Sequence, residues 1–178
     1  VLWGLIALNG CNITVKGSEL RAVGILYTGR VRAVVNNMKN EVYYADFSYQ
    51  SPYHELQFIE TKVRTWNFYT SNNAALEIRN CVYGESISFG KSQINVFDSI
   101  CDGTGGYIGA KEDSKTNFYG GEIACDVLTH DRAQFLIQDC GQVRGRIEAA
   151  GQSKITVVNT PLGGTVREIE EGEVTINN

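Results

Sequence analysis

The amino-acid sequence predicts an all-β fold in which short strands wind into a solenoid, and three observations support this prediction. Strand-forming residues (Val, Ile, Thr, Tyr and Phe) dominate short runs that end at Gly, Asn, Asp or Ser. No window of about 10 to 15 residues carries apolar side chains at helical spacing. The same short phrase also returns along the chain with a mean period near 20 residues.

The repeated phrase is a β-prone residue, one spacer, and then a small polar residue or Gly. We call the β-prone residue the anchor, and successive anchors are 18 to 23 residues apart. Helical repeats would need amphipathic helices and leucine-rich repeats would need a Leu scaffold, and the sequence contains neither. A β-solenoid, in which each repeat is one turn stacked on the next, is the remaining explanation. The nine anchors are Val15, Met38, Phe58, Ile78, Val96, Phe118, Ile137, Val157 and Ile176.

The residue two positions after each anchor predicts a corner. Asn, Asp and Gly tolerate the left-handed backbone of a tight bend, and Glu60 is the exception among these positions. Stacked turns would place the corners above one another as a ladder, so each phrase is a strand that runs into a corner. The corner positions are Gly17, Asn40, Glu60, Asn80, Asp98, Gly120, Asp139, Asn159 and Asn178.

The rest of a turn contains two more short strands. In the repeat that starts at residue 77, a second strand is expected at 81–84 and a third at 86–89, and residues 90–93 turn back into the next repeat. The third strand recurs at 45–48, 66–69, 107–110, 126–129, 146–149 and 165–168. Its expected inward-facing row is Ile25, Phe47, Phe68, Ile87, Ile108, Val127, Ile147 and Val166.

Three strands per coil with one short corner resemble the right-handed parallel β-helix of the pectate-lyase-like superfamily. The resemblance spans residues 1–178 and implies a single domain of about nine coils of roughly 20 residues. It also implies that a substrate groove would follow the third-strand sheet. It concerns architecture alone, because the sequence carries no catalytic motif of that superfamily.

Composition excludes several kinds of partner. The net charge is −4 and the 16 Lys and Arg residues are scattered, which argues against nucleic acid. No apolar run approaches the roughly 18 residues that a membrane span requires, and we interpret the apolar opening at 1–10 as a buried strand. The chain starts inside a strand and ends at a corner. We therefore expect a segment of a longer protein, or ends capped by flanking domains or by other copies in a homo-oligomer.

Cysteine, histidine and acidic residues provide no metal or cofactor signature. Asp98, Asp102 and Asp113 fall in turns of one coil, but their spacing matches no calcium-binding loop. His54 and His130 are expected in exposed turns four coils apart, too far for shared catalysis. The cysteines form no CxxC pair, so buried reduced thiols are expected, with one disulfide between coils as the alternative. The five cysteines are Cys11, Cys81, Cys101, Cys125 and Cys140.

The outward face of the third strand contains the candidate catalytic residues. Asp126 and Glu148 would be diagonal neighbours roughly 7–8 Å apart, within the range of about 6.5–9.5 Å that inverting glycosidases use. An Arg beside a carboxylate would instead suit a lyase that acts on a uronate. In the third interpretation, Asp126–Arg146 and Glu148–Arg167 are ion pairs between coils with no catalytic role.

The same face suggests a glycan as the partner, because sugars bind polar side chains and flat rings. Substrate-binding candidates are Tyr69, Tyr107, Asp46 and Asn67. The prediction is a carbohydrate-binding or carbohydrate-active β-helix, like a polysaccharide lyase, a glycosidase or a phage tailspike, and catalysis stays undecided. A structural or adhesive solenoid that self-associates is the alternative. The fold favours an extracellular or virion-surface location.

Overall fold

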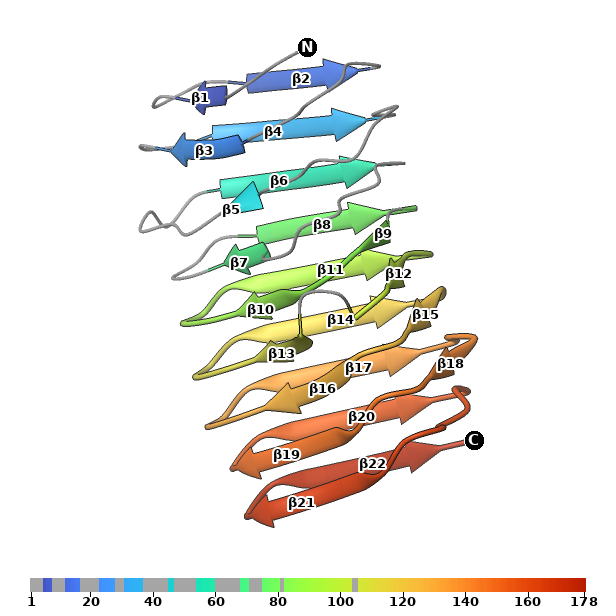
Figure 1. Ribbon diagram of the computed structural model, residues 1–178. Helices are drawn as coiled ribbons and strands as arrows, with labels where there is room; N and C mark the ends of the chain where they lie inside the picture. Colours follow the sequence, from blue (N-terminus) through green and yellow to red (C-terminus); the bar gives the residue numbers. More distant parts are fainter. Residues whose placement is uncertain are drawn as a thin grey trace.

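A computed structural model describes the chain from its N-terminal strands to its last residue, with gaps. The described residues are 5–7, 12–16, 23–27, 31–36, 45–46, 54–59, 68–70, 75–80, 82–103 and 106–178. Backbone pairing is described throughout these ranges, and side-chain environments from Leu76 onward. Every strand pair in these ranges is parallel, and Figure 1 shows the strands stacked in chain order from the N-terminal to the C-terminal end.

The largest sheet contains nine strands, which are hydrogen-bonded in sequence order (Figure 1). It contains eight of the nine expected anchors, all except Met38. Its strands are β2 Asn12–Lys16, β4 Val31–Asn36, β6 His54–Ile59, β8 Ala75–Arg79, β11 Gln93–Phe97, β14 Lys115–Tyr119, β17 Gln134–Gln138, β20 Lys154–Val158 and β22 Glu173–Asn177.

Two further sheets complete each turn. A four-stranded sheet contains the short second strands, which are β9 Val82–Tyr83, β12 Ile100–Cys101, β15 Glu122–Ile123 and β18 Gln142–Val143. A six-stranded sheet contains the third strands, which are β7 Phe68–Thr70, β10 Ser86–Ser88, β13 Tyr107–Ala110, β16 Asp126–Thr129, β19 Ile147–Gly151 and β21 Val166–Glu170. A separate three-stranded sheet contains β1 Leu5–Ala7, β3 Val23–Tyr27 and β5 Ala45–Asp46.

The described chain is therefore an all-β parallel solenoid with about five turns of about 19 residues. Each of these turns contains three strands, one in each of the nine-, four- and six-stranded sheets. This confirms the predicted solenoid and its three-strand turn. Parallel strands need long crossover connections, and here the rest of each turn serves as the crossover. No helix among the described residues is long and apolar enough to cross a membrane.

The anchors form one column, with a single correction. Val15 pairs with Val35 and Val35 with Phe58, so Val35 holds the position that was predicted for Met38. Met38 lies outside the described residues. The β-branched run at 31–36 is the better strand former. The rule that places an anchor two residues before a small polar residue selected Met38 because Asn40 follows it, and this choice was wrong. From Phe58 the column continues as predicted through Ile78, Val96, Phe118, Ile137, Val157 and Ile176.

The inward row of the third strand is confirmed at Ile108, Val127 and Ile147, which pair in register and are buried. Val166 continues the register but is 41% exposed, Phe47 lies outside the described residues, and one turn differs from the expectation. Ser86, and not Ile87, pairs with Phe68 and Ile108, and Ser86 and Ser88 are fully buried. Tyr83 is also fully buried, and Ser86 Oγ donates to its hydroxyl oxygen at 3.4 Å, while Ile87 on the other side of the strand is 3% exposed. Hydrogen bonds offset the cost of burying the hydroxyls, since Ser88 Oγ lies 2.8 Å from Ser114 Oγ.

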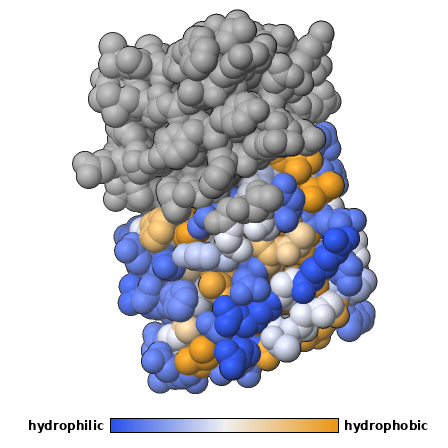
Figure 2. All heavy atoms as spheres, in the orientation of Figure 1, coloured by the Kyte–Doolittle hydropathy of each residue, from blue (hydrophilic) through white to orange (hydrophobic). Residues whose placement is uncertain are grey.

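The core is a continuous column of inward-facing apolar side chains from successive turns. Phe118 and Phe135 are its largest members after Tyr83, and both are buried. Burial alternates along the strands of the nine-stranded sheet, as in β14 and β17, where each inward residue is buried and its neighbours are not. In Figure 2 hydrophilic side chains cover most of the visible surface of the described turns.

Candidate functional site

The candidate site lies on the outer face of the six-stranded sheet, where three neighbouring turns bring charged residues together. Asp126 is the first residue of β16, Arg146 directly precedes β19, and Glu148 lies within β19. Arg167 in β21 pairs with Glu148 in the strand register. Because alternate residues of a strand face the same side, these four side chains project outward from the sheet. We call Asp126, Arg146, Glu148 and Arg167 the ion-pair chain.

Arg146 connects the two carboxylates of the ion-pair chain. Its Nη2 lies 3.1 Å from Asp126 Oδ2 and its Nη1 lies 3.4 Å from Glu148 Oε2. The backbone N–H of Arg146 also donates to Asp126 Oδ1 at 2.8 Å. Arg167 Nη1 reaches Glu148 Oε2 at 3.8 Å. The predicted ion pairs Asp126–Arg146 and Glu148–Arg167 are confirmed, and the Arg146–Glu148 pair within one strand was not foreseen.

Burial differs along the ion-pair chain. The side chain of Glu148 is 12% exposed and that of Arg146 is 35% exposed, whereas that of Arg167 is 60% exposed. The Nε of Arg146 is buried and has no hydrogen-bond acceptor among the described residues. The guanidinium is therefore held through its two Nη groups. Arg167 presents the most accessible positive charge, and a carboxylate or sulfate group could reach it in a forked geometry.

Tyr107 neighbours the ion-pair chain, because it pairs with Asp126 across the β13–β16 register. Its ring covers Gly109, since a Cβ at Gly109 would lie 3.3 Å from Tyr107 Cε2. Lys111 Nζ lies 5.9 Å from the centre of the same ring. A partly exposed ring beside a cation and a carboxylate is a surface on which a sugar could stack and form hydrogen bonds.

The other predicted binding residues are less fully described. Tyr69 lies in β7 and pairs with Ile87, and Asp46 lies in β5 and pairs with Gly24. Their backbone positions place them on third strands, as predicted. Asn67 lies outside the described residues.

Glu85 is a site residue that sequence reasoning missed. Ser86 pairs with Ile108, so Glu85, which is on the turn before Tyr107, lies beside Tyr107. Glu85 therefore belongs to the same outward row as Tyr107 and Asp126. Only 6% of Glu85 is exposed, and burial raises the pKa of its carboxyl. The expected alternation in residues 86–89 was shifted by one position, and that shift hid Glu85.

The predicted corner ladder is present. Asn80, Asp98, Asp139 and Asn159 have φ values of 47° to 54°, and Gly120 in the same column has a φ of 68°. Asn159 Nδ2 donates to Asp139 Oδ1 at 3.1 Å, which links two neighbouring corners. Each of these five corners also donates its backbone N–H to the next turn, as Asp139 does to Val158 O. Gly17, Asn40 and Glu60 lie outside the described residues.

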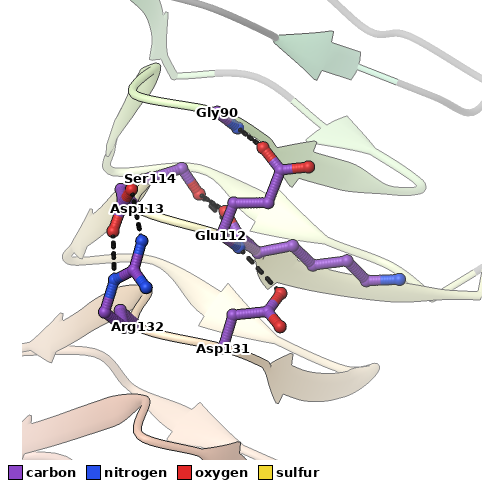
Figure 3. Close-up of polar contacts among 7 residues, drawn as sticks. Gly90, Glu112, Asp113, Ser114, Asp131 and Arg132 are labelled. Carbon is purple, nitrogen blue, oxygen red and sulfur yellow. Dashed lines mark hydrogen bonds and ion pairs between the residues drawn. The ribbon is translucent and has the colours of Figure 1, made fainter.

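A second column of residues with left-handed backbone conformation lies where the third strand turns into the next anchor strand. This column was not identified from the sequence. Gly90, Glu112, Asp131, Gly151 and Glu170 have φ values of 60° to 68°. Figure 3 shows how its carboxylates are used: Glu112 Oε2 accepts from the N–H of Gly90 at 2.7 Å, and Asp131 Oδ2 accepts from the N–H of Glu112 at 3.1 Å. The similar turn sequences at 90–93 and 151–154 are the feature of the sequence that could have predicted this second column.

Arg132 forms a two-bond ion pair with Asp113 beside this second column, at 2.7 and 2.9 Å (Figure 3). The hydrogen bond from Arg132 lowers the pKa of Asp113. Asp113 is therefore engaged at one corner of the turn, whereas Asp98 lies in the first left-handed column at another. Within the part of the chain that the structure describes, no three His, Cys, Asp or Glu side chains form a group that could hold a metal ion.

The histidines lie far apart along the solenoid, because His54 begins β6 and His130 precedes β17, which is four strands further along the nine-stranded sheet. His130 lies in a turn after β16, as predicted, but His54 is the first residue of β6 and not part of a turn. The distance between the two strands still argues against a shared catalytic role.

Three cysteines lie in the described part, and all three are buried free thiols. Cys101 Sγ lies 2.8 Å from Cys125 Sγ on the next turn. The sulfur of Cys140 contacts backbone oxygens, among them Gly120 O at 3.4 Å, and the side chain of Thr160. Burial raises the pKa of Cys140 to about 11. The predicted burial is confirmed for these three residues, and Cys11 and Cys81 lie outside the described ranges.

The fold thus defines the chain as a parallel β-solenoid. The chain matches no family model, no curated protein and no solved structure. Its function must therefore be argued from the geometry of its own surface.

Proposed function

We propose that the protein is a carbohydrate-binding β-solenoid and that the glycan lies along the outer face of the six-stranded sheet. The observation that carries this proposal is the grouping of Tyr107, Lys111 and the ion-pair chain on consecutive turns of that face. Neighbouring turns are spaced about 4.8 Å apart, so this row matches the length of a few sugar units.

The substrate class that fits this face best is an acidic polysaccharide. Arg167 is largely exposed and Lys111 lies beside an aromatic ring, so a uronate or sulfate could bind either cation while a pyranose ring covers Tyr107. Binding is favoured over hydrolysis. Asp126 and Glu148 both contact the guanidinium of Arg146, so both carboxyl groups are already engaged within the protein, whereas a glycosidase needs two that face the glycosidic bond.

The finer features of the fold belong to this proposal as well. We infer a right-handed helix of about nine turns over residues 1–178, similar in architecture to the pectate-lyase-like superfamily and to phage tailspikes. A polysaccharide on a virion or cell surface would then be the natural partner, and flanking domains or further copies of the chain would cover the terminal turns.

A structural or adhesive solenoid is the second candidate, and one observation favours it. The charges of the ion-pair chain compensate one another, so the face is already satisfied without a ligand. In this case the ion pairs would only align adjacent turns.

A panel of acidic and neutral polysaccharides distinguishes the two candidates. Binding is followed by calorimetry, and catalysis by the release of reducing or unsaturated ends. On any glycan that binds, Arg167→Ala and Arg146→Ala should each weaken affinity about tenfold or more, as expected when a charged hydrogen bond is lost. Arg132→Ala is the matched control, because Arg132 is an ion-paired arginine at a different corner.

Unchanged affinity in the Arg167 and Arg146 variants, with normal melting, would remove this face from consideration. If no polysaccharide in the panel binds the parent protein, the structural candidate is favoured. Release of unsaturated ends would instead identify a lyase.

A further inference from the structure

The sulfurs of Cys101 and Cys125 are in contact in the buried interior of the described turns. Cys101 ends β12, and Cys125 follows β15 on the next turn. Their Sγ atoms are 2.8 Å apart, and either thiol can donate to the other. A disulfide has a bond length of about 2.0 Å, so closing the remaining gap needs only a small rotation of the two side chains.

We propose that Cys101 and Cys125 form a disulfide site that joins two adjacent turns of the solenoid and closes when a peroxide oxidises it. The two thiols are held in contact by the strand register, because Cys101 pairs with Ile123 and the N–H of Ala124 donates to Cys101 O at 2.8 Å. This backbone pairing gives the thiols a high effective concentration toward each other. The inference is independent of the glycan proposal.

The chemistry balances with one peroxide per pair. A thiolate attacks one oxygen of hydrogen peroxide, which forms a sulfenic acid and releases hydroxide. The second thiol then attacks the sulfenic sulfur, the S–S bond forms, and the hydroxyl leaves with the remaining proton as water. Two thiols and one peroxide therefore give one disulfide and two waters. Cys125 is the first thiol to react, because it is 5% exposed whereas Cys101 is not exposed.

The site has a matched control within the same chain. Cys140 is also a buried free thiol, but its sulfur is hydrogen-bonded to the backbone oxygens Phe118 O, Gly120 O and Gln138 O and to the Thr160 side chain, and no second thiol is paired with it among the described residues. Burial alone would make the three thiols behave alike. Cys101 and Cys125 differ from Cys140 because each has the sulfur of the other within contact distance.

The bond would also constrain the candidate glycan face. Asp126 directly follows Cys125, and the register places Asp126 beside Tyr107 on the turn that begins near Cys101. Closing the disulfide would lock these two turns against sliding or opening. The sequence separation of 24 residues also makes the closed loop long enough to restrict the unfolded chain.

The test treats the full chain with a small excess of hydrogen peroxide after complete reduction, blocks the remaining thiols, and maps the peptides by mass spectrometry. We expect a peptide pair linked through Cys101 and Cys125, two hydrogens lighter than the reduced pair. The melting temperature of the oxidised protein should rise by roughly 5–15 °C, and dithiothreitol should reverse the rise. Cys140→Ser should retain both results, whereas Cys125→Ser and Cys101→Ser should lose both.

Several outcomes would overturn the proposal. The first is linkage of Cys101 to Cys140 or to other cysteines as often as to Cys125. The second is over-oxidation of Cys101 and Cys125 to sulfinic acids without a linked peptide. The third is no reaction of the pair under conditions that link the cysteines of the urea-unfolded chain. A Cys101→Ala and Cys125→Ala double variant, which keeps the interior apolar, replaces the serine variants if these fail to fold.

Discussion

The left-handed corner at Asp139 allows a quantitative test of the ladder that repeats along the solenoid. Asp139 has a φ of 54°. Its Oδ1 accepts from Asn159 Nδ2 at 3.1 Å and its Oδ2 accepts from Gln138 Nε2 at 3.0 Å. The change Asp139→Val places a β-branched side chain in this backbone conformation and removes both hydrogen bonds.

The expected loss combines two terms. A left-handed conformation costs an ordinary L-residue roughly 1–2 kcal/mol, and two exposed hydrogen bonds contribute at most about 0.5–1 kcal/mol each. Because both bonds are solvent-exposed, we expect Asp139→Val to lower the free energy of unfolding by about 2–3 kcal/mol. For a chain of this size, that lowers the melting temperature by roughly 5–10 °C.

A second substitution separates the two terms. Asp139→Gly removes the same hydrogen bonds but tolerates the left-handed backbone, so it should cost only about 0–1 kcal/mol. Gln134→Val is the control, because it places Val at an exposed position in strand β17 and should change stability by about 0.5 kcal/mol or less.

The assay is thermal and urea unfolding followed by far-UV circular dichroism. The reasoning is refuted if Asp139→Val melts like the parent protein. It is also refuted if the Val and Gly variants lose the same stability, because the backbone term would then be absent.

Two further predictions concern titration and thiol reactivity. Burial raises the pKa of Glu85 above its ordinary value of 4.5. The native state therefore binds the proton of the Glu85 carboxyl more tightly than the unfolded chain does. The stability that this protonation contributes is present at low pH and is lost as pH rises through the raised pKa. Melting temperatures measured across this pH range should decline less for Glu85→Gln than for the parent, and parallel profiles would contradict the assignment. Cys101, Cys125 and Cys140 are buried, so a thiol reagent should react slowly with the folded protein and with three or more thiols after unfolding in urea; fast labelling of these three cysteines in the native state would show that the interior is open.

The candidate site was partly accessible to sequence reasoning. Asp126, Arg146, Glu148 and Arg167 were grouped from their positions in successive third strands, and they do form one chain of ion pairs. Their spacing follows from the period of the repeat, which can be counted in the sequence. Glu85 was not found, because its burial depends on neighbouring turns that the sequence of its own turn does not reveal.

The sequence by itself determined the repeat, the strand type and the left-handed corners at Asn80, Asp98, Asp139 and Asn159. These features are local, since a residue's tolerance of positive φ is a property of that residue and its backbone. The tertiary structure decided which side of a strand faces inward when both choices were open. Ser86 takes the register position that was expected for Ile87, and its hydroxyl donates to the buried Tyr83 side chain at 3.4 Å. The tertiary structure also brought Cys101 and Cys125 into contact, because side-chain packing depends on the stacking of turns, which no single turn encodes.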